Sequence, residues 1–202
     1  MALRTIVQDG DPILKKVCKP VVKFDDRLAQ LLDDMAETLL DANGLGLAAP
    51  QVGVMRRVFI ALDEGEDEEE APEDEEAQQG EEVPEGEEEP EAVAEPKILE
   101  FINPEILSQE GERKIYEGCL SFPGKYGAIV RPAKVTVKAF DRNGNPFTME
   151  AKEMLARCIC HETNHLDGIT IDDLAEYFYD PETPHELDGN FEEDQEETGD
   201  EN

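Results

Sequence analysis

The sequence predicts an α+β fold, with antiparallel β-sheets packed around a central helix near the C-terminal end and a second helix near the N-terminus. Three observations support this prediction. An apolar stripe at helical spacing follows residue 25, strand-like runs separated by turn residues extend from about residue 58 to residue 151, and a mostly apolar helical run follows them. At 202 residues, the chain suits one domain with appendages.

The N-terminal helix is predicted from apolar residues that share one helical face. Asp25 or Asp26 can cap its start, and Asn43-Gly44 can end it. The apolar positions recur with a period near 3.6 residues, at Leu28, Leu31, Leu32, Met35 and Leu39. We therefore expect this helix to pack on the core through that stripe.

The strands are predicted from apolar runs and one turn signal. Residues 58–62 read as a buried strand that an acidic stretch interrupts and that resumes at residues 98–102. Further along, residues 135–140 and 147–151 flank a turn at residues 141–144, which predicts a β-hairpin. These runs provide the antiparallel sheets.

The formal net charge of -33 comes from two segments. Residues 63–95 hold 19 acidic residues and residues 180–202 hold 11, and neither segment has Lys or Arg. Without these 30, the remaining 21 acidic residues nearly balance 18 basic ones. We predict a disordered insertion at 63–96 and a disordered tail at 180–202, because such compositions cannot bury enough apolar surface to fold. Solvation is the simplest role of the insertion, and binding a basic partner is the alternative.

The cysteines and the N-terminus predict a reducing compartment. Met1 to Gly10 lacks the apolar core of a secretory signal, and no apolar run approaches the roughly 20 residues that span a bilayer. We therefore expect a cytoplasmic protein that does not bind membranes and keeps its four cysteines as free thiols.

The later helix carries the sequence His161-Glu162-Thr163-Asn164-His165. Histidines four residues apart lie on one helical face, so both rings can reach one metal ion, while Glu162 points about 100° to the side. Such a metal lowers the pKa of its bound water, and the carboxylate can move the water's proton. A solvated helical face is the alternative, but the preceding run at 154–160 is mostly apolar and favours burial.

A zinc-like site needs a third protein ligand. His185 and the tail carboxylates are downstream candidates, as in zinc proteases. Upstream, Cys119 follows a glycine in the sequence Glu117-Gly118-Cys119-Leu120-Ser121. A lone cysteine is more often a small buried apolar residue, so the residues alone leave the choice open.

Three motifs together resemble the signatures of the peptide deformylase family. Residues 117–121 resemble its second signature, and residues 161–165 its third. The first, G-x-G-x-A-A-x-Q, matches residues 44–51, which alone would suggest only a tight turn of small residues. The motifs stand in the family's order, and the resemblance extends from about Ile6 to Leu174.

The resemblance implies an enzyme that removes the formyl group from N-formylmethionyl peptides. Cys119, His161 and His165 would hold one divalent metal ion. Iron(II) is the favoured metal, with zinc and nickel as alternatives that the same ligands suit. Glu162 would move the proton of the attacking water to the departing amine.

The resemblance also implies how the substrate is held. The side-chain amide of Gln51 and the backbone N–H of Leu120 would stabilise the oxyanion. Gly46 and Gly118 would pair with the substrate backbone as if it were an added strand, with Gly44 in the same cleft wall. Cys158 would line the pocket for the methionine side chain.

Some positions depart from the family's usual pattern. Asn164 stands where relatives usually have Asp, and Cys160 where many have Gln, so the hydrogen bonds around the metal site are expected to differ. Glu117 and Arg131 are expected to form the family's supporting ion pair.

The expected partners are nascent N-formylmethionyl peptides. Ribosome contact would be transient, because the tail at 180–202 is acidic where some relatives carry a basic helix that could dock on RNA. No direct binding to nucleic acid is therefore expected. Residues 1–179 would form the catalytic domain.

Two other functions remain open. One is a zincin-type metalloprotease, which shares H-E-x-x-H but takes its third ligand downstream. The other is an acidic interaction protein built on a catalytically idle scaffold, for which the intact set of polar site residues has no explanation.

Overall fold

The computed structural model describes residues 2–63 and 97–179. Most of the predicted insertion, the predicted tail and the candidate ligand His185 lie outside the described residues. Asp63, which we assigned to the insertion, instead belongs to strand β2 (Val58–Asp63).

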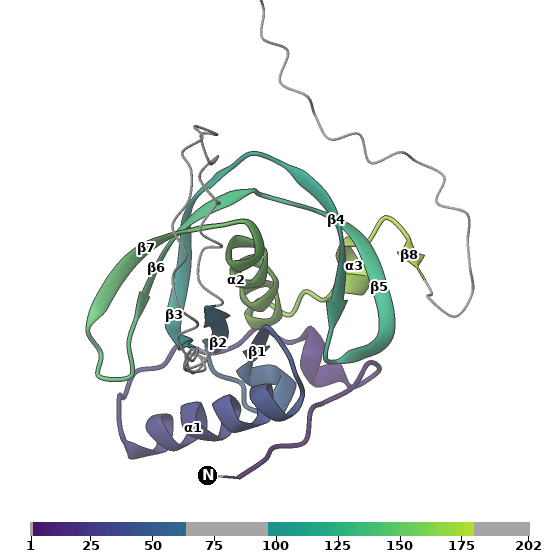
Figure 1. Cartoon of the computed structure of the whole chain (residues 1–202). Coiled ribbons are helices and arrows are strands. Elements are labelled where there is room, and N and C mark those ends of the chain that lie inside the picture. The colour runs from purple at the N-terminus through teal and green to yellow at the C-terminus, as the bar shows by residue number, and fades with distance from the viewer. Residues whose placement is uncertain (1, 64–96, 180–202) are drawn as a thin grey trace, which may run out of the picture.

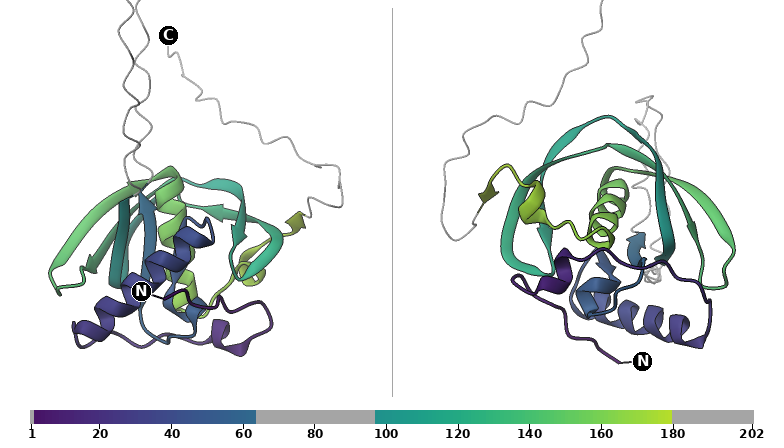
Figure 2. Two further views of the ribbon diagram at one scale, coloured as in Figure 1. Left: turned by 60° about the horizontal axis from the view of Figure 1, so that its bottom comes forward. Right: turned by 180° about the vertical axis from the view of Figure 1, so that it is seen from behind.

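Two antiparallel sheets surround the helix α2 (Glu153–Leu166), as Figures 1 and 2 show. The larger has the order β1-β2-β3-β6-β7, and the smaller the order β4-β5-β8. The predicted α+β architecture is confirmed. The remaining strands are β1 (Gly46–Ala48), β3 (Lys97–Glu110), β4 (Arg113–Cys119), β5 (Phe122–Arg131), β6 (Lys134–Phe140), β7 (Pro146–Lys152) and β8 (Phe178–Tyr179).

The predicted hairpin is confirmed as β6 and β7, but one strand prediction is wrong. Residues 58–62 and 98–102 are not one interrupted strand. They belong to β2 and β3, which pair antiparallel with Asp63 opposite Lys97 at the ends. Both runs are apolar because both strands are buried, and composition cannot show whether two buried runs continue in line or turn back beside each other.

The predicted N-terminal helix is α1 (Asp26–Asp41), with Asp25 as the N-cap accepting from the Leu28 N–H. Its apolar stripe packs on Leu47, Val58 and Ile60 of β1 and β2. Helix α2 ends at Leu166, and Gly168 follows it at φ 74°, a conformation that glycine adopts without strain.

Several short elements were not predicted. They are the 3-10 turns at Pro12–Lys15 and Ala49–Val52, strands β1, β5 and β8, and helix α3 (Ile171–Leu174). The sequence of β5 has Pro at its second position and contains two glycines, so it lacks the apolar alternation that identifies a strand. Its partner β4 supplies the pairing that fixes its extended conformation.

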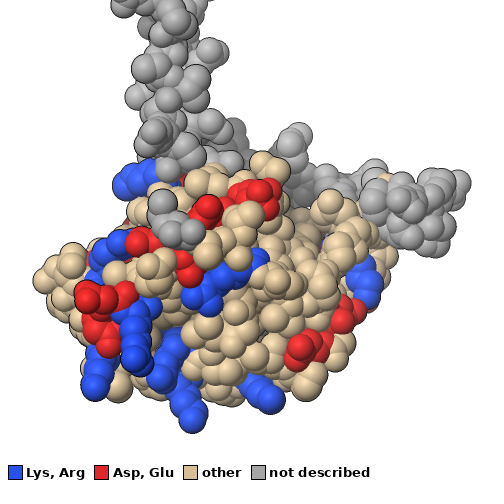
Figure 3. All heavy atoms as spheres, turned by 90° about the horizontal axis from the view of Figure 1, so that it is seen from below, with Lys and Arg blue, Asp and Glu red and all other residues tan. Residues whose placement is uncertain are grey.

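Charged side chains of both signs are interspersed on the lower face of the molecule (Figure 3). This distribution agrees with the near balance of charge expected outside the two acidic segments. Within residues 2–63 and 97–179, no helix has the length and apolar character that crossing a bilayer requires.

The core contact between Phe59 and Phe101 should contribute strongly to the free energy of unfolding. Their rings stack 4.6 Å apart between centroids, and neither side chain is exposed. Phe101→Ala should lower the free energy of unfolding by about 3–5 kcal/mol, as measured by urea denaturation. Phe178→Ala, at a side chain that is 40% exposed, should cost less than about 1 kcal/mol. Equal losses in the two variants would show that this account of the core is wrong.

Candidate active site

Three potential metal ligands meet between β4 and α2. Cys119 ends β4, and His161 and His165 lie one turn apart on α2. The Cys119 Sγ is 3.3 Å from the His165 Nε2, which is 3.1 Å from the His161 Nε2. All three ligand atoms lie within 4.8 Å of one another. The structure therefore brings together the residues that the two motifs supply.

These separations fit a tetrahedral cation. Typical zinc distances imply about 3.3 Å between two imidazole nitrogens and about 3.6 Å between sulfur and nitrogen. Hydrogen bonds to Cys119 and Glu117 outweigh burial and raise the pKa of His161 to about 10, so binding a cation would release a proton from this site. Burial lowers the pKa of His165 well below its usual value, which leaves a neutral ring suited to coordination.

Glu117 orients His161. Its carboxylate accepts a hydrogen bond from the His161 Nδ1 at 2.6 Å, which leaves the Nε2 facing the other two ligands. Arg131 binds the same carboxylate at 2.9 and 2.5 Å, confirming the expected ion pair, and also donates to Asn164 at 2.6 Å. Burial opposes ionisation of Glu117, but the hydrogen bonds from Arg131 and His161 outweigh it and lower its pKa to about 2.

Glu162 lies beside the three ligands, buried and close to the backbone of β1. Burial raises the pKa of Glu162 to about 7, where the carboxyl group can both accept and donate a proton. A Cβ atom built on Gly46 would lie 2.5 Å from the Glu162 Oε1 and 2.6 Å from the Cys158 Sγ. Only glycine at position 46 allows the strand to approach these side chains so closely.

Gln51 directs its amide nitrogen toward the candidate metal ligands. Its Oε1 accepts from the Ala48 N–H at 2.8 Å, and its Nε2 lies 3.2 Å from the Ser121 Oγ and 3.6 Å from the Cys119 Sγ. Because the oxygen is held by the backbone, the N–H donors face the site.

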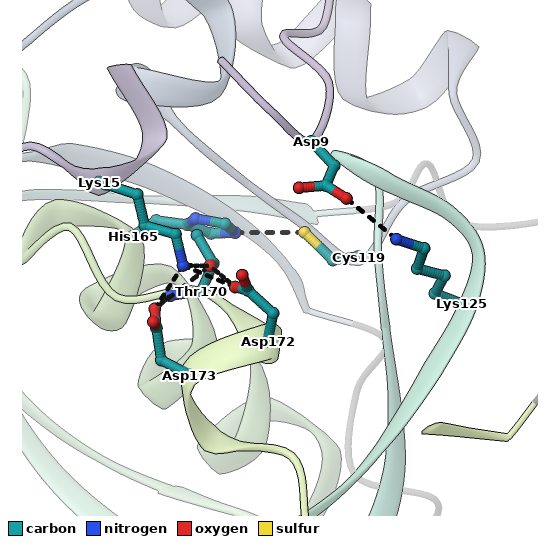
Figure 4. A network of polar contacts seen from close by, with 8 residues as sticks. All are labelled: Asp9, Lys15, Cys119, Lys125, His165, Thr170, Asp172 and Asp173. Atoms are coloured by element: carbon teal, nitrogen blue, oxygen red, sulfur yellow. Dashed lines mark hydrogen bonds and ion pairs between the residues drawn. The ribbon is translucent and has the colours of Figure 1, made fainter. Parts of the chain in front are cut away.

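Leu120 lies in the turn between β4 and β5, directly after Cys119. The N-terminal segment holds this turn: the Asp9 N–H donates to the Ser121 carbonyl at 2.8 Å, and the Gln8 side chain donates to the Leu120 carbonyl at 3.3 Å. Asp9 also pairs with Lys125 of β5 at 2.9 Å (Figure 4).

A second polar cluster connects the N-terminal region to the segment that follows α2. The Lys15 Nζ binds Thr170, Asp172 and Asp173 at 2.6–2.7 Å, as Figure 4 shows next to the contact between Cys119 and His165. The chain that precedes α1 thus contacts both the turn after Cys119 and the segment after His165.

The site opens into a cleft of about 430 Å³. The cleft is lined by the predicted substrate-binding residues Gly44, Gly46, Gly118 and Cys158, as well as by Gln51, Leu120 and Glu162. Strands β1 and β4 each stand at the edge of their sheet, and residues of both line the cleft. An extended peptide could therefore add to a sheet edge here.

Cys158 faces the cleft as a neutral thiol. Burial raises its pKa well above the usual value, and its Sγ donates to the Leu45 carbonyl at 3.4 Å. A protonated thiol is a poor metal ligand, so the geometry favours a role in lining the pocket over a role as a fourth ligand.

Sequence reasoning missed several cleft residues, among them Tyr126, Met154 and Arg157. Tyr126 pairs with Gly118 across β4 and β5, so recognising β5 would have placed it there. Met154 lies four residues before Cys158 and three before Arg157, so its place on this side of the helix was visible in the sequence, but the spacing identified no partner for that face.

Comparisons with known proteins agree on one family. The family model described as "Polypeptide deformylase" matches residues 3–177. A peptide deformylase of Acetivibrio thermocellus is 46% identical over 89% of this chain and 88% of its own length. A peptide deformylase of Caldicellulosiruptor bescii is 44% identical over 90% of this chain and 91% of its own length. The crystal structure of a peptide deformylase from Legionella pneumophila superposes with a TM-score of 0.69, at 38% identity and covering 86% of each chain.

The buried pair of Arg131 and Glu117 predicts an unequal effect of two arginine substitutions. Arg131→Met should destabilise the protein by about 3–5 kcal/mol, because it leaves a buried carboxylate without its cation. Arg113→Met removes a similar pair with Glu153, but both of those side chains are exposed, so the loss should be below about 1 kcal/mol. Urea denaturation of both variants measures the difference, and losses of similar size would contradict a structural role for the buried pair.

Proposed function

The chain belongs to the polypeptide deformylase family of metal-dependent amide hydrolases, and on that premise we propose how its residues divide the removal of the N-formyl group from nascent polypeptides. The observation that carries the proposal is the convergence of Cys119, His161 and His165 beside Glu162 and Gln51 in one cleft.

Cys119, His161 and His165 hold one divalent cation. A cation held there would polarise the formyl oxygen and lower the pKa of its bound water, to about 7 in zinc enzymes. The proposal rests on the facing Nε2 and Sγ atoms and on Glu117, which keeps the His161 ring turned toward them. Iron(II) is the favoured ion, and zinc and nickel are the alternatives.

Glu162 is the general base and then the general acid. It takes the proton of the water that attacks the formyl carbon and gives it to the amine that leaves, so formate and a free N-terminal amine are the products. Its burial and its pKa near neutrality support both roles.

Gln51 and Leu120 stabilise the negative charge that develops on the formyl oxygen. The Gln51 Nε2 faces the Cys119 sulfur, and the backbone N–H of Leu120 belongs to the residue that follows this ligand. Both donors are held before the reaction, since Gln51 is tied to Ala48, and Gln8 and Asp9 hold the turn of Leu120.

The substrate peptide lies extended between the edges of β1 and β4. Gly46 and Gly118 pair with its backbone, Gly44 leaves room beside them, and Cys158 lines the pocket for the methionine side chain. Glycine at position 118 suits this contact, because a Cβ there would lie 3.0 Å from the Tyr126 ring.

The wider assignments follow from the same activity. Residues 1–179 form the catalytic domain, with residues 64–96 as an insertion and residues 180–202 as a tail. The enzyme acts in the cytoplasm, where formylated chains emerge, and its proximity to the ribosome is transient. The acidic composition of residues 180–202 supports the expectation that it does not bind nucleic acid directly.

Formate release from formyl-Met-Ala-Ser by the metal-loaded protein tests the activity. Glu162→Ala should lower kcat by about 100- to 10,000-fold, the usual value of a positioned acid or base. Glu105→Ala, at an exposed carboxylate on β3, should leave kcat unchanged. Absence of formate with the unchanged protein would refute the proposed function.

The zincin alternative predicts a different response of metal content. Cys119→Ser should lose most of the bound metal in this proposal, because a thiolate ligand is replaced by a weak one. A zincin with its third ligand downstream would remain metallated. Metal content per chain, measured by elemental analysis after gel filtration, separates the two, and Cys18→Ser is the matched control at a buried cysteine outside the site.

A further inference from the structure

A second cavity adjoins the cleft. Its volume is about 290 Å³, roughly two thirds of that of the cleft. It lies between the start of α2 and the ends of β4 and β5 that are remote from Cys119, and it shares Met154 and Arg157 with the cleft. The other lining residues are Arg113, Ile115, Arg131, Pro132, Ala133 and Glu153.

The two cavities are successive spaces between the same two elements. On β4, Glu117 lines the cleft and Ile115 lines the second cavity, and residues two apart share one face of a strand. On α2, Cys158 lines the cleft and Met154 lies one turn earlier on the same face, about 6 Å along the axis. A side chain that enters between Cys158 and Glu117 and continues along α2 therefore meets Met154 and Arg157 next.

These two side chains form a partition that can open. Arg157 donates to the Met154 sulfur, a weak acceptor, and no carboxylate in the described part of the chain pairs with Arg157. The Met154 side chain is unbranched and 41% exposed, so few contacts hold its rotamer.

The chemistry of the second cavity suits an uncharged chain. Ile115, Pro132 and Ala133 provide apolar surface. The guanidinium of Arg131 is engaged by Glu117, and that of Arg113 pairs with Glu153 at 3.2 Å, so neither is free to bind a ligand anion.

We propose that the second cavity is an extension of the pocket for the first side chain of the substrate, closed by Met154 and opened when that side chain turns aside. This inference rests on the proposed function and deepens it. The enzyme then accepts N-formyl peptides whose first residue carries an unbranched apolar side chain longer than that of methionine, and Met154 sets the limit of length.

Two peptides and three variants test the inference. Formyl-norleucyl-Ala-Ser matches methionine in length, and formyl-2-aminooctanoyl-Ala-Ser is two methylene groups longer. The measured quantity is the ratio of kcat/KM for the long peptide to that for the short one. Met154→Ala should raise this ratio about tenfold over the unchanged protein, since it exposes apolar space for two further methylene groups. Met154→Phe should lower it by filling the passage.

Met149→Ala is the matched control, because Met149 packs in the core cluster behind β7 and lines neither cavity. It should leave the ratio unchanged. If Met154→Ala and Met154→Phe shift the ratio in the same direction, or if neither shifts it, the second cavity is not part of the pocket.

A binding measurement keeps this result separate from the proposed function. The Kd values of the same two peptides, determined by calorimetry in Glu162→Ala protein with and without Met154→Ala, should show the same shift in ratio. Absence of formate from formyl-Met-Ala-Ser would count against the proposed function. An unchanged Kd ratio would overturn the extended pocket even if formate is released.

Discussion

The rest of the site depends on the hydrogen bonds that the carboxylate of Glu117 accepts from two other elements. It extends from β4 and is bound by Arg131 from β5 and by His161 from α2, so one buried group links the smaller sheet to the central helix. A buried carboxylate is stable only when its lone pairs are satisfied, and here the groups that satisfy it are those that must be held in place. The position of Cys119, two residues further along β4, follows from that anchor.

The cleft depends on two strand edges that pair with no further strand among the residues that the structure describes. Sheet edges normally attract other strands, and proteins usually block them. Here β1 and β4 end their sheets beside the candidate metal ligands, and glycine at positions 46 and 118 keeps the backbone accessible. In the proposed function, the arrangement that would be a liability elsewhere is the place where the extended substrate peptide binds.

The surroundings of the cleft combine rigid and adjustable parts. The N-terminal segment holds the turn of Leu120 through Gln8 and Asp9, and the hydrogen bond from Ala48 fixes Gln51. In contrast, the Met154 side chain at the start of α2 is 41% exposed and contacts the Arg157 side chain. Groups that meet developing charge need fixed positions, whereas a wall around an apolar side chain can yield at little cost.

The sequence by itself determined the elements with strong periodicity, α1, α2 and the hairpin of β6 and β7, and its three motifs identified the residues that line the site. Only the tertiary structure decided that β2 and β3 turn back beside each other, that β5 is a strand, and that Met154 and Arg157 line the cleft. The reason is physical: local spacing records which face of an element is apolar, whereas pairing partners and cavities arise from contacts between residues far apart in the chain.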